Sequence, residues 1–358
     1  MTRKEAACRI LHDRHVDAMI VQDMSNIRYL TGYTNDTGVL LLTTDGAGYL
    51  LTDFRFFFQA KQEAVGYEVM DVSGNTYAGL LESLMQKHGV KTVAIEQEIV
   101  TYGEYRNYRD TLSAETVPVD NILIALRAVK NDGEIELLRK AEQIGDQAFE
   151  RILADIKPGV TEREIAAKLT YYMSMLGASG NSFPPIVASG VNSSMPHAMP
   201  GERAVREGDF ITMDFGCIYN GYCSDMTRTV VLGNADERQK AVYNTVLKAQ
   251  EATLAAIHAG MRGKDIDAVA RTIIYEAGYE GCFGHGLGHS VGLQIHEPPY
   301  ANARSEAIVP AGSMMTVEPG IYIEQYGGVR IEDLVVVTET GYENLTHSPK
   351  QLIELPVK

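Results

Sequence analysis

Along the first 122 residues, short apolar runs alternate with longer segments in which apolar residues recur at helical spacing. Residues 1–23 read as an amphipathic helix followed by the apolar run Ala18–Val21. A hairpin is expected where two apolar runs flank Asp45-Gly46-Ala47-Gly48. The remaining expected elements are two helices and a strand, at Phe56–Glu63, Tyr77–His88 and Thr92–Ile95. This order predicts a small α/β domain over residues 1–122.

A second pattern begins after a linker at residues 123–131. Apolar residues at helical spacing run from Asp132 to Asp155, and Lys157-Pro158-Gly159 ends the segment. Thr161 with Glu164 is typical of a capping box and predicts a further helix to about Leu176. The hairpin that follows completes a helix, helix, hairpin unit.

The same unit occurs a second time. Helices are expected near Glu237–Ala259 and Asp265–Ala277, and a hairpin near Ser313–Thr338. Ile156-Lys157-Pro158-Gly159 is echoed by Ile257-His258-Ala259-Gly260 at an offset of 101 (257 minus 156). We therefore predict an α+β chain whose second domain, residues 132–358, packs two related halves about a pseudo-twofold axis with the hairpins inside.

Each hairpin carries two acids in matched places. Thr212-Met213-Asp214-Phe215-Gly216 recurs as Thr316-Val317-Glu318-Pro319-Gly320, and each copy is followed by a second acid, Asp225 or Glu332. If Asn220-Gly221 forms the turn, Tyr219 faces Tyr222 and Asp214 faces Thr227. Asp225 then lies diagonally from Asp214 at roughly 7–8 Å, within reach of a common cation.

The chemistry of these acids has two interpretations. Acids on an apolar face repel one another and require a countercharge, which Arg228 or Arg330 could supply as a salt bridge. Four acids in repeated positions favour instead a pair of divalent ions at roughly 3.5–4 Å. Carboxylate ligands favour Mn, with Co and Zn as alternatives. An imidazole ligand is expected from His285-Gly286-Leu287-Gly288-His289 or His296, between which spacing does not choose.

Composition narrows the class of protein. With 358 residues, 45% hydrophobic and 22% charged, the chain is typical of a soluble globular protein of two domains. The net charge of −15 argues against a nucleic-acid surface. We expect neither a signal peptide nor a membrane span. The four cysteines fit no disulfide framework, which predicts reduced thiols in a cytoplasmic protein.

Together these residues resemble the pita-bread metallopeptidases, the family of Xaa-Pro aminopeptidases, prolidases and methionine aminopeptidases. The resemblance covers essentially the whole chain. Ile27-Arg28-Tyr29-Leu30-Thr31-Gly32 and Thr52-Asp53-Phe54-Arg55 look like the creatinase/prolidase-like amino-terminal domain of the proline-specific branch, which methionine aminopeptidases usually lack. The resemblance implies that residues 132–358 form the pita-bread catalytic domain.

The resemblance also implies roles for single residues. The implied metal ligands are Asp214, Asp225, His289, Glu318 and Glu332. Of these, Asp225 and Glu332 are implied to be bridging or bidentate. It implies that Glu318 takes a proton from a hydroxide or water shared by two ions, and that His197 and His296 bind substrate and handle protons. Arg330 is expected either to bind a substrate carboxylate or to support the acids by a salt bridge.

The implied activity is metal-dependent hydrolysis of the Xaa-Pro bond in dipeptides or short peptides with proline in second place. Two alternatives remain open: an Xaa-Pro aminopeptidase acting on longer peptides, and a pita-bread scaffold that binds peptides without metal. The proline-specific relatives imply a homodimer.

Overall fold

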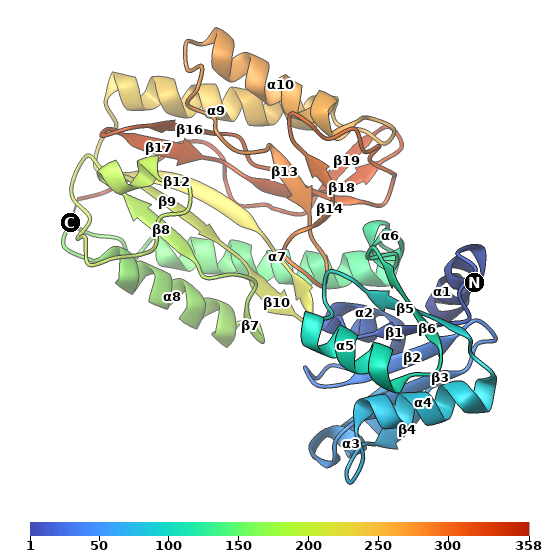
Figure 1. Cartoon of the computed structure of the whole chain (residues 1–358). Helices are drawn as coiled ribbons and strands as arrows, with labels where there is room; N and C mark the ends of the chain where they lie inside the picture. The colour runs from blue at the N-terminus through green and yellow to red at the C-terminus, as the bar shows by residue number, and fades with distance from the viewer. Residues whose placement is uncertain (358) are drawn as a thin grey trace. The chain divides into compact units, whose positions relative to one another are not determined.

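The computed structural model describes residues 1–357 and divides into two compact units, residues 1–127 and 128 onward (Figure 1). The predicted linker, residues 123–131, contains the short helix α6 (Ile124–Ala128). The linker and domain limits expected from the sequence stay a prediction, and each unit is described by itself.

The first unit is a six-stranded sheet with the strand order β4-β3-β2-β1-β5-β6, in which only β2 runs antiparallel to its neighbours. The strands are β1 Ala18–Val21, β2 Val39–Thr43, β3 Gly48–Thr52, β4 Glu68–Asp71, β5 Thr92–Glu96 and β6 Glu115–Val119. The helices are α1 Arg3–Asp13, α2 Met24–Thr31, α3 Phe54–Glu63, α4 Tyr77–His88 and α5 Tyr102–Thr111. The expected mixed α/β architecture is confirmed.

The start of the chain contains less helix than expected. Helix α1 begins at a capping box between Thr2 and Glu5 and ends at Asp13. The run Ala18–Val21 is then strand β1, buried at all four positions between β2 and β5. A strand buried on both faces reads as an unbroken apolar run, so the alternation that marks a strand is missing from the sequence.

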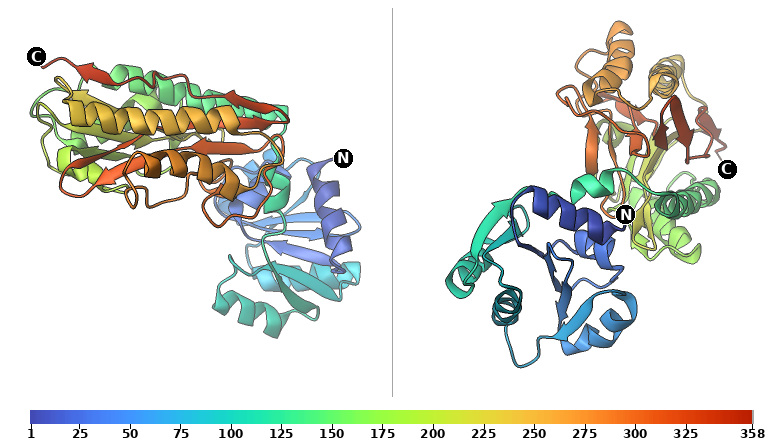
Figure 2. Two further views of the ribbon diagram at one scale, coloured as in Figure 1. Left: turned by 90° about the horizontal axis from the view of Figure 1, so that it is seen from above. Right: turned by 90° about the vertical axis from the view of Figure 1, so that its right-hand side faces the viewer.

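Four helices cover the second unit in two pairs. They are α7 Asp132–Ile152, α8 Glu162–Met175, α9 Glu237–Ala256 and α10 Gly263–Glu276. The inner strands lie between α9 with α10 at the top of Figure 1 and α7 with α8 at the middle height of the picture, and the right-hand view of Figure 2 shows the same separation. The predicted capping box at Thr161 and Glu164 begins α8. Within residues 1–357, no helix is long and apolar enough to cross a membrane.

The strands of the second unit fall into two sets. The first half contains β7 Gly180–Asn181, β8 Ile186–Ser189, β9 Phe210–Phe215, β10 Cys217–Tyr219, β11 Tyr222–Cys223 and β12 Met226–Leu232. The second half contains β13 Gly288–Ser290, β14 Glu297–Ala301, β15 Met314–Val317, β16 Gly320–Ile323, β17 Gly327–Arg330, β18 Asp333–Thr338 and β19 Gly341–Asn344. The last strand, β20 Ile353–Leu355, returns to pair with β12.

The first hairpin has the predicted register. Asn220 and Gly221 both have positive φ, 46° and 84°, as a two-residue type I′ turn requires. Tyr219 pairs with Tyr222, and Asp214 pairs with Thr227.

Side chains alternate along β9 between two hydrophobic cores. Ile211, Met213 and Phe215 pack with α7 and α8, whereas Phe210 packs with α9 and α10. Asp214 lies on the same strand face as Phe210, because successive side chains point to opposite faces. Its carboxylate is therefore directed to the space between the two halves.

In the second hairpin the two acids lie at breaks between strands and not within the paired strands. Glu318 falls between β15 and β16, and Glu332 falls between β17 and β18. Pro319 follows Glu318 and has no N–H for a ladder hydrogen bond, so the pairing stops there. Arg330 ends β17 opposite Gly320, so it does not share a continuous strand with Glu332.

Candidate active site

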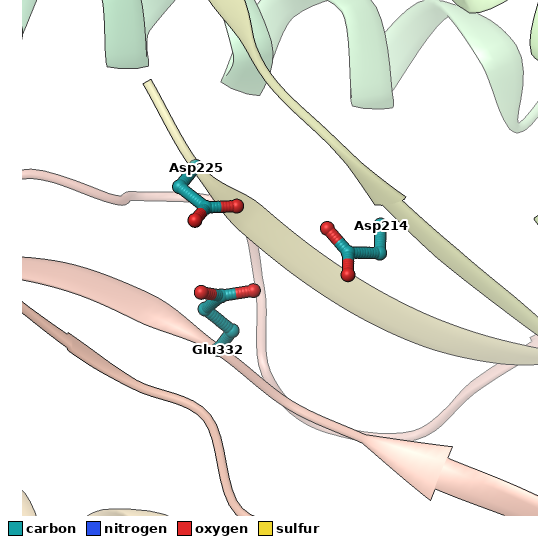
Figure 3. Close-up of side chains that lie close together, drawn as sticks. All are labelled: Asp214, Asp225 and Glu332. Atoms are coloured by element: carbon teal, nitrogen blue, oxygen red, sulfur yellow. The ribbon is translucent and has the colours of Figure 1, made fainter. Parts of the chain in front are cut away.

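Three buried carboxylates converge where the two halves of the second unit meet. Asp214 comes from β9, Asp225 precedes β12 and Glu332 precedes β18. One oxygen from each lies within 4.8 Å of the others, and Figure 3 shows the three side chains pointing toward one another. Asp214 Oδ1 and Glu332 Oε1 are buried without a hydrogen-bond partner among the described residues. Because buried oxygens are rarely left without a partner, this set fits a divalent cation.

Glu318 and His289 complete the cluster. His289 Nε2 lies 3.5 Å from Asp225 Oδ2 and 3.5 Å from Glu318 Oε1. His289 Nδ1 lies 3.1 Å from the carbonyl oxygen of Ser290. A proton on Nδ1 that is donated to this carbonyl leaves Nε2 free to bind a metal, the tautomer that metal-binding histidines usually adopt.

His285 lies in the same region but has other partners. Its Nε2 lies 2.9 Å from the hydroxyl of Tyr322, and its Nδ1 lies 2.7 Å from the carbonyl oxygen of Gly286. Both ring nitrogens are therefore engaged within the protein, and His289 is the imidazole that faces the acids.

Burial shifts the pKa values of Glu318, Asp225 and His289 toward the neutral form of each group. Burial raises the pKa of Glu318 to about 8. Burial first, and repulsion from Glu332 next, raise the pKa of Asp225 well above its usual range. Burial lowers the pKa of His289 to about 4. Because desolvation and like charges both oppose ionisation, a bound cation is what would let these acids ionise together.

A glycine brings the histidine to the acids. A Cβ on Gly288 would lie 1.9 Å from the carbonyl oxygen of Thr316, so only glycine lets β13 approach β15 this closely. The hydroxyl of Thr316 accepts a hydrogen bond from the N–H of His289 at 3.0 Å and donates to Glu318 Oε1 at 3.1 Å. One threonine thus connects the histidine backbone to the carboxylate.

Three further residues support the acids and were not singled out from the sequence. The Thr227 hydroxyl donates to Glu332 Oε2 at 2.6 Å. Glu142, fully buried on α7, accepts from the N–H of Asp225 at 3.3 Å. The Tyr322 hydroxyl accepts a hydrogen bond from Arg330 at 2.7 Å. The position of Thr227 opposite Asp214 was a usable signal, whereas the other two contacts depend on tertiary packing.

Arg330 is bound on all sides by the protein. Its guanidinium donates to Asp214 Oδ2, to the hydroxyls of Tyr322 and Thr227, and to the carbonyl oxygen of Pro196. The side chain is only 3% exposed. These contacts match the alternative in which Arg330 supports an acidic ligand.

A cavity of about 470 Å³ opens onto this cluster. All five of the predicted ligands line it, together with His197, His285, His296 and Arg330. Its apolar lining consists of Phe183, Pro184, Ile186, Pro196, Met199, Ile295 and Tyr300. The rings of His289 and His296 have centroids 4.4 Å apart. The cavity therefore combines oxygen ligands, imidazoles and an apolar wall, and its volume suits a small ligand.

His197 is held by a loop that is tied to a buried acid. Glu162, at the start of α8, accepts hydrogen bonds from the N–H and hydroxyl of Ser189, the amide of Asn192 and the N–H of Gly201. These donors lie on both sides of His197 in the sequence. Glu162 thus fixes both ends of the loop that brings His197 to the cavity.

Comparisons with known proteins identify related peptidases. Residues 136–339 match Metallopeptidase family M24, and residues 3–129 match the Creatinase/Prolidase N-terminal domain. An Xaa-Pro dipeptidase of Pyrococcus horikoshii is 34% identical, with 94% of this chain and 95% of the relative covered. The structure of an Xaa-Pro dipeptidase from Bacillus anthracis aligns at TM-score 0.96 and 40% identity, covering 98% and 99% of the two chains. An X-Pro aminopeptidase from Thermotoga maritima aligns at TM-score 0.90 and 38% identity, covering 94% and 97%.

Proposed function

The chain belongs to metallopeptidase family M24 and is a hydrolase, and from this we propose that it cleaves the Xaa-Pro bond of dipeptides or short peptides. One observation carries the proposal. Asp214 and Glu332 each have a buried oxygen without a hydrogen-bond partner among the described residues, and both line a cavity together with His289 and apolar side chains. A metal-dependent peptidase needs such a cation site beside a pocket for an apolar ring such as proline.

The residues that would hold two divalent ions are Asp214, Asp225, His289, Glu318 and Glu332. When bound, such ions polarise a carbonyl group and lower the pKa of water toward neutrality. Carboxylate-rich ligands without a thiolate favour Mn, with Co or Zn as alternatives.

Glu318 is proposed as the group that accepts a proton from the attacking water. Thr316 donates to its Oε1, which leaves Oε2 for the proton. Burial raises the pKa of the Glu318 carboxyl to about 8, so the surrounding protein favours the protonated form of this group.

His296 and His197 are proposed to bind the substrate and handle protons, because both line the cavity. Burial lowers the pKa of His296, so its imidazole is neutral near pH 7 and can both accept and donate a hydrogen bond. A neutral imidazole can stabilise the developing oxyanion by a hydrogen bond. The proline nitrogen must also gain a proton before it leaves, because an unprotonated amide nitrogen is a poor leaving group.

One observation favours the alternative of an aminopeptidase that acts on longer peptides. A dipeptide places its carboxylate in the site, and such a group is usually met by a guanidinium or ammonium. Arg330 is the only Lys or Arg among the described residues that line the cavity, and it already donates to Asp214, Tyr322, Thr227 and Pro196. A peptide with a residue after proline has no carboxylate at that point.

The test uses Ala-Pro, Ala-Pro-Ala and Ala-Ala, with metal-stripped protein before and after Mn²⁺ is added. We expect cleavage of a proline peptide only with metal, and none of Ala-Ala. Cleavage of Ala-Pro alone identifies a dipeptidase, whereas faster cleavage of Ala-Pro-Ala identifies an aminopeptidase. If neither proline peptide is cleaved with Mn²⁺ or Co²⁺, the proposal fails and the metal-free scaffold is favoured.

The quaternary structure and the compartment belong to the same proposal. A homodimer rests on the resemblance to proline-specific peptidases, and a monomer in light scattering at working concentration would contradict it. The four cysteines are free thiols, in keeping with the proposed cytoplasmic location.

A further inference from the structure

The buried ammonium of Lys130 contacts both Ser290 and Glu297. Each of these two residues directly follows a histidine of the site. We propose that Lys130 is a positioning residue that sets the spacing of His289 and His296. The role of this spacing in catalysis rests on the proposed function, whereas the placement of the histidines themselves does not.

The ammonium of Lys130 donates to Ser290 Oγ and to Glu297 Oε2, both at 3.1 Å. The side chains of Lys130 and Glu297 are each only 1% exposed. A buried pair of this kind is maintained only with good geometry, because both charges have lost their water. The distance between Ser290 and Glu297 is therefore fixed by one cation.

Ser290 and Glu297 are the two ends of the loop that carries His296. They pair with each other across β13 and β14, where the register shifts between His289 and Ser290. A shift of this kind redirects the side chains on either side of it. Closing the loop at Ser290 and Glu297 places the rings of His289 and His296 with centroids 4.4 Å apart.

The loop is also folded around the carboxylate of Glu297. Glu297 Oε1 accepts a hydrogen bond from the N–H of Gln294 at 3.1 Å. A Cβ on Gly292 would lie 2.6 Å from Glu297 Oε2, so the loop backbone packs directly against the acid. The position of this carboxylate thus determines the path of the chain from Val291 to His296.

Lys130 is itself anchored to the strand that leads to Glu318. Its N–H donates to the carbonyl oxygen of Gly312 at 2.9 Å, and Val129 forms an isolated bridge with Ser313. Strand β15 begins at the next residue, Met314. The ammonium therefore links the histidine loop to the acid-bearing hairpin of the same half.

The experiment compares three variants with the wild type. Lys130→Met removes the ammonium and leaves the Glu297 carboxylate buried alone, so it is expected to lose stability as well. Lys130→Met/Glu297→Gln removes both charges and keeps an amide oxygen for Gln294. Lys168→Met is the matched control, because Lys168 forms an ion pair with Asp155 at 2.6 Å but is 44% exposed and is not among the residues that line the cavity.

Four kinds of measurement are made: melting temperature, Mn²⁺ affinity of the metal-stripped protein, hydrogen exchange in residues 291–296, and steady-state kinetics (kcat and KM) on the cleaved proline peptide. For the double variant we expect a melting temperature close to wild type and faster exchange in the loop. Mn²⁺ affinity or kcat should fall by about ten- to a hundredfold, the usual effect of losing a group that orients a metal ligand. The control should match the wild type in all four.

If the double variant regains wild-type exchange, Mn²⁺ affinity and kcat, Lys130 only balances charge and the proposal is wrong. The same conclusion follows if Lys130→Met melts at a lower temperature but is otherwise unchanged. If the wild type cleaves no proline peptide, the proposed function fails, while exchange and Mn²⁺ affinity still decide the role of Lys130.

Discussion

At the scale of single residues, the site is a set of acids that the protein alone does not neutralise. Arg330 is paired with Asp214, and Thr227 donates to Glu332, but Asp214 Oδ1 and Glu332 Oε1 remain without partners in the described chain. The missing positive charge determines how the metal-free protein responds to pH.

Glu318 gives a prediction with a definite sign. Its pKa is about 8 in the folded metal-free chain, against an ordinary value of 4.5. Between these values the folded state holds a proton that the unfolded state has released, so stability is fully present below pH 4.5 and is lost as pH rises through 8. We expect the free energy of unfolding, in chelator, to fall by about 1–2 kcal/mol between pH 6.5 and 8.5.

Glu318→Gln is the control, because glutamine does not titrate. His289, with a lowered pKa, acts with the opposite sign, but its effect lies below pH 6.5 and outside this window. The fall in the free energy of unfolding should be smaller in the variant, as measured by denaturant titration at each pH. An equal fall in both proteins would show that Glu318 is not the group responsible.

A residue of the site could be predicted only where a local sequence motif contains it. The four acids could be predicted from the sequence, because each occurs in a repeated motif. The engagement of Arg330 by Tyr322 and Pro196 could not, because those partners are brought to it only by packing. Glu142 was hidden for the same reason, as one of several acids on a long amphipathic helix.

At the scale of elements, the site depends on where strands stop and how closely they approach. Glu318, Asp225 and Glu332 all lie at interruptions between strands, where a side chain is free of the regular alternation. Gly288 permits the close approach of β13 to β15 that brings His289 to Glu318.

Gly288→Ala is therefore expected to separate these two strands. Its Cβ would lie 1.9 Å from a backbone oxygen of Thr316, which cannot move without displacing Glu318. We expect a loss of roughly 1–3 kcal/mol in the free energy of unfolding, as for overpacking, and weaker Mn²⁺ binding by calorimetry.

Gly284→Ala is the matched control in the same glycine-rich segment. A Cβ there meets nothing within 4 Å, and the residue does not have positive φ. Stability and Mn²⁺ binding should stay near wild type. Equal effects of the two substitutions would mean that flexibility of the segment, and not the approach of β13 to β15, is what matters.

Helices and strands could be predicted where the apolar periodicity extended over many residues and was bounded by capping or turn residues. The expected helix from Asp132 corresponds to α7, which is 21 residues long and begins at a capping box. The turn at Asn220-Gly221 also follows from local chemistry. The strand β1 and the breaks beside Glu318 and Glu332 depend on burial and on partner strands, which local patterns do not contain.

At the scale of the whole molecule, the two units have separate cores. One core contains only residues of the first unit, from Ala18 to Ala114. All five proposed ligands lie in the second unit, beyond residue 128. Metal binding should therefore stabilise one unit and leave the other unchanged.

Calorimetry of the whole chain tests this division. We expect two unfolding transitions, of which only one moves when Mn²⁺ is added. At a free concentration a hundredfold above Kd, the added stability is about 2.7 kcal/mol, which corresponds to roughly 5–10 °C for a unit of this size. A single transition that moves as a whole would show that the units unfold together.

The backbone at Val129 and Lys130 has a mechanical consequence. The chain leaves the first unit at Arg127, and within three residues it is fastened by the Val129 bridge to Ser313 and by the Lys130 N–H to Gly312. A force applied along the chain from the first unit therefore loads these two backbone contacts before it reaches the acids. These two contacts are expected to resist tension at the edge of β15, so that the proposed metal ligands keep their positions until the contacts break.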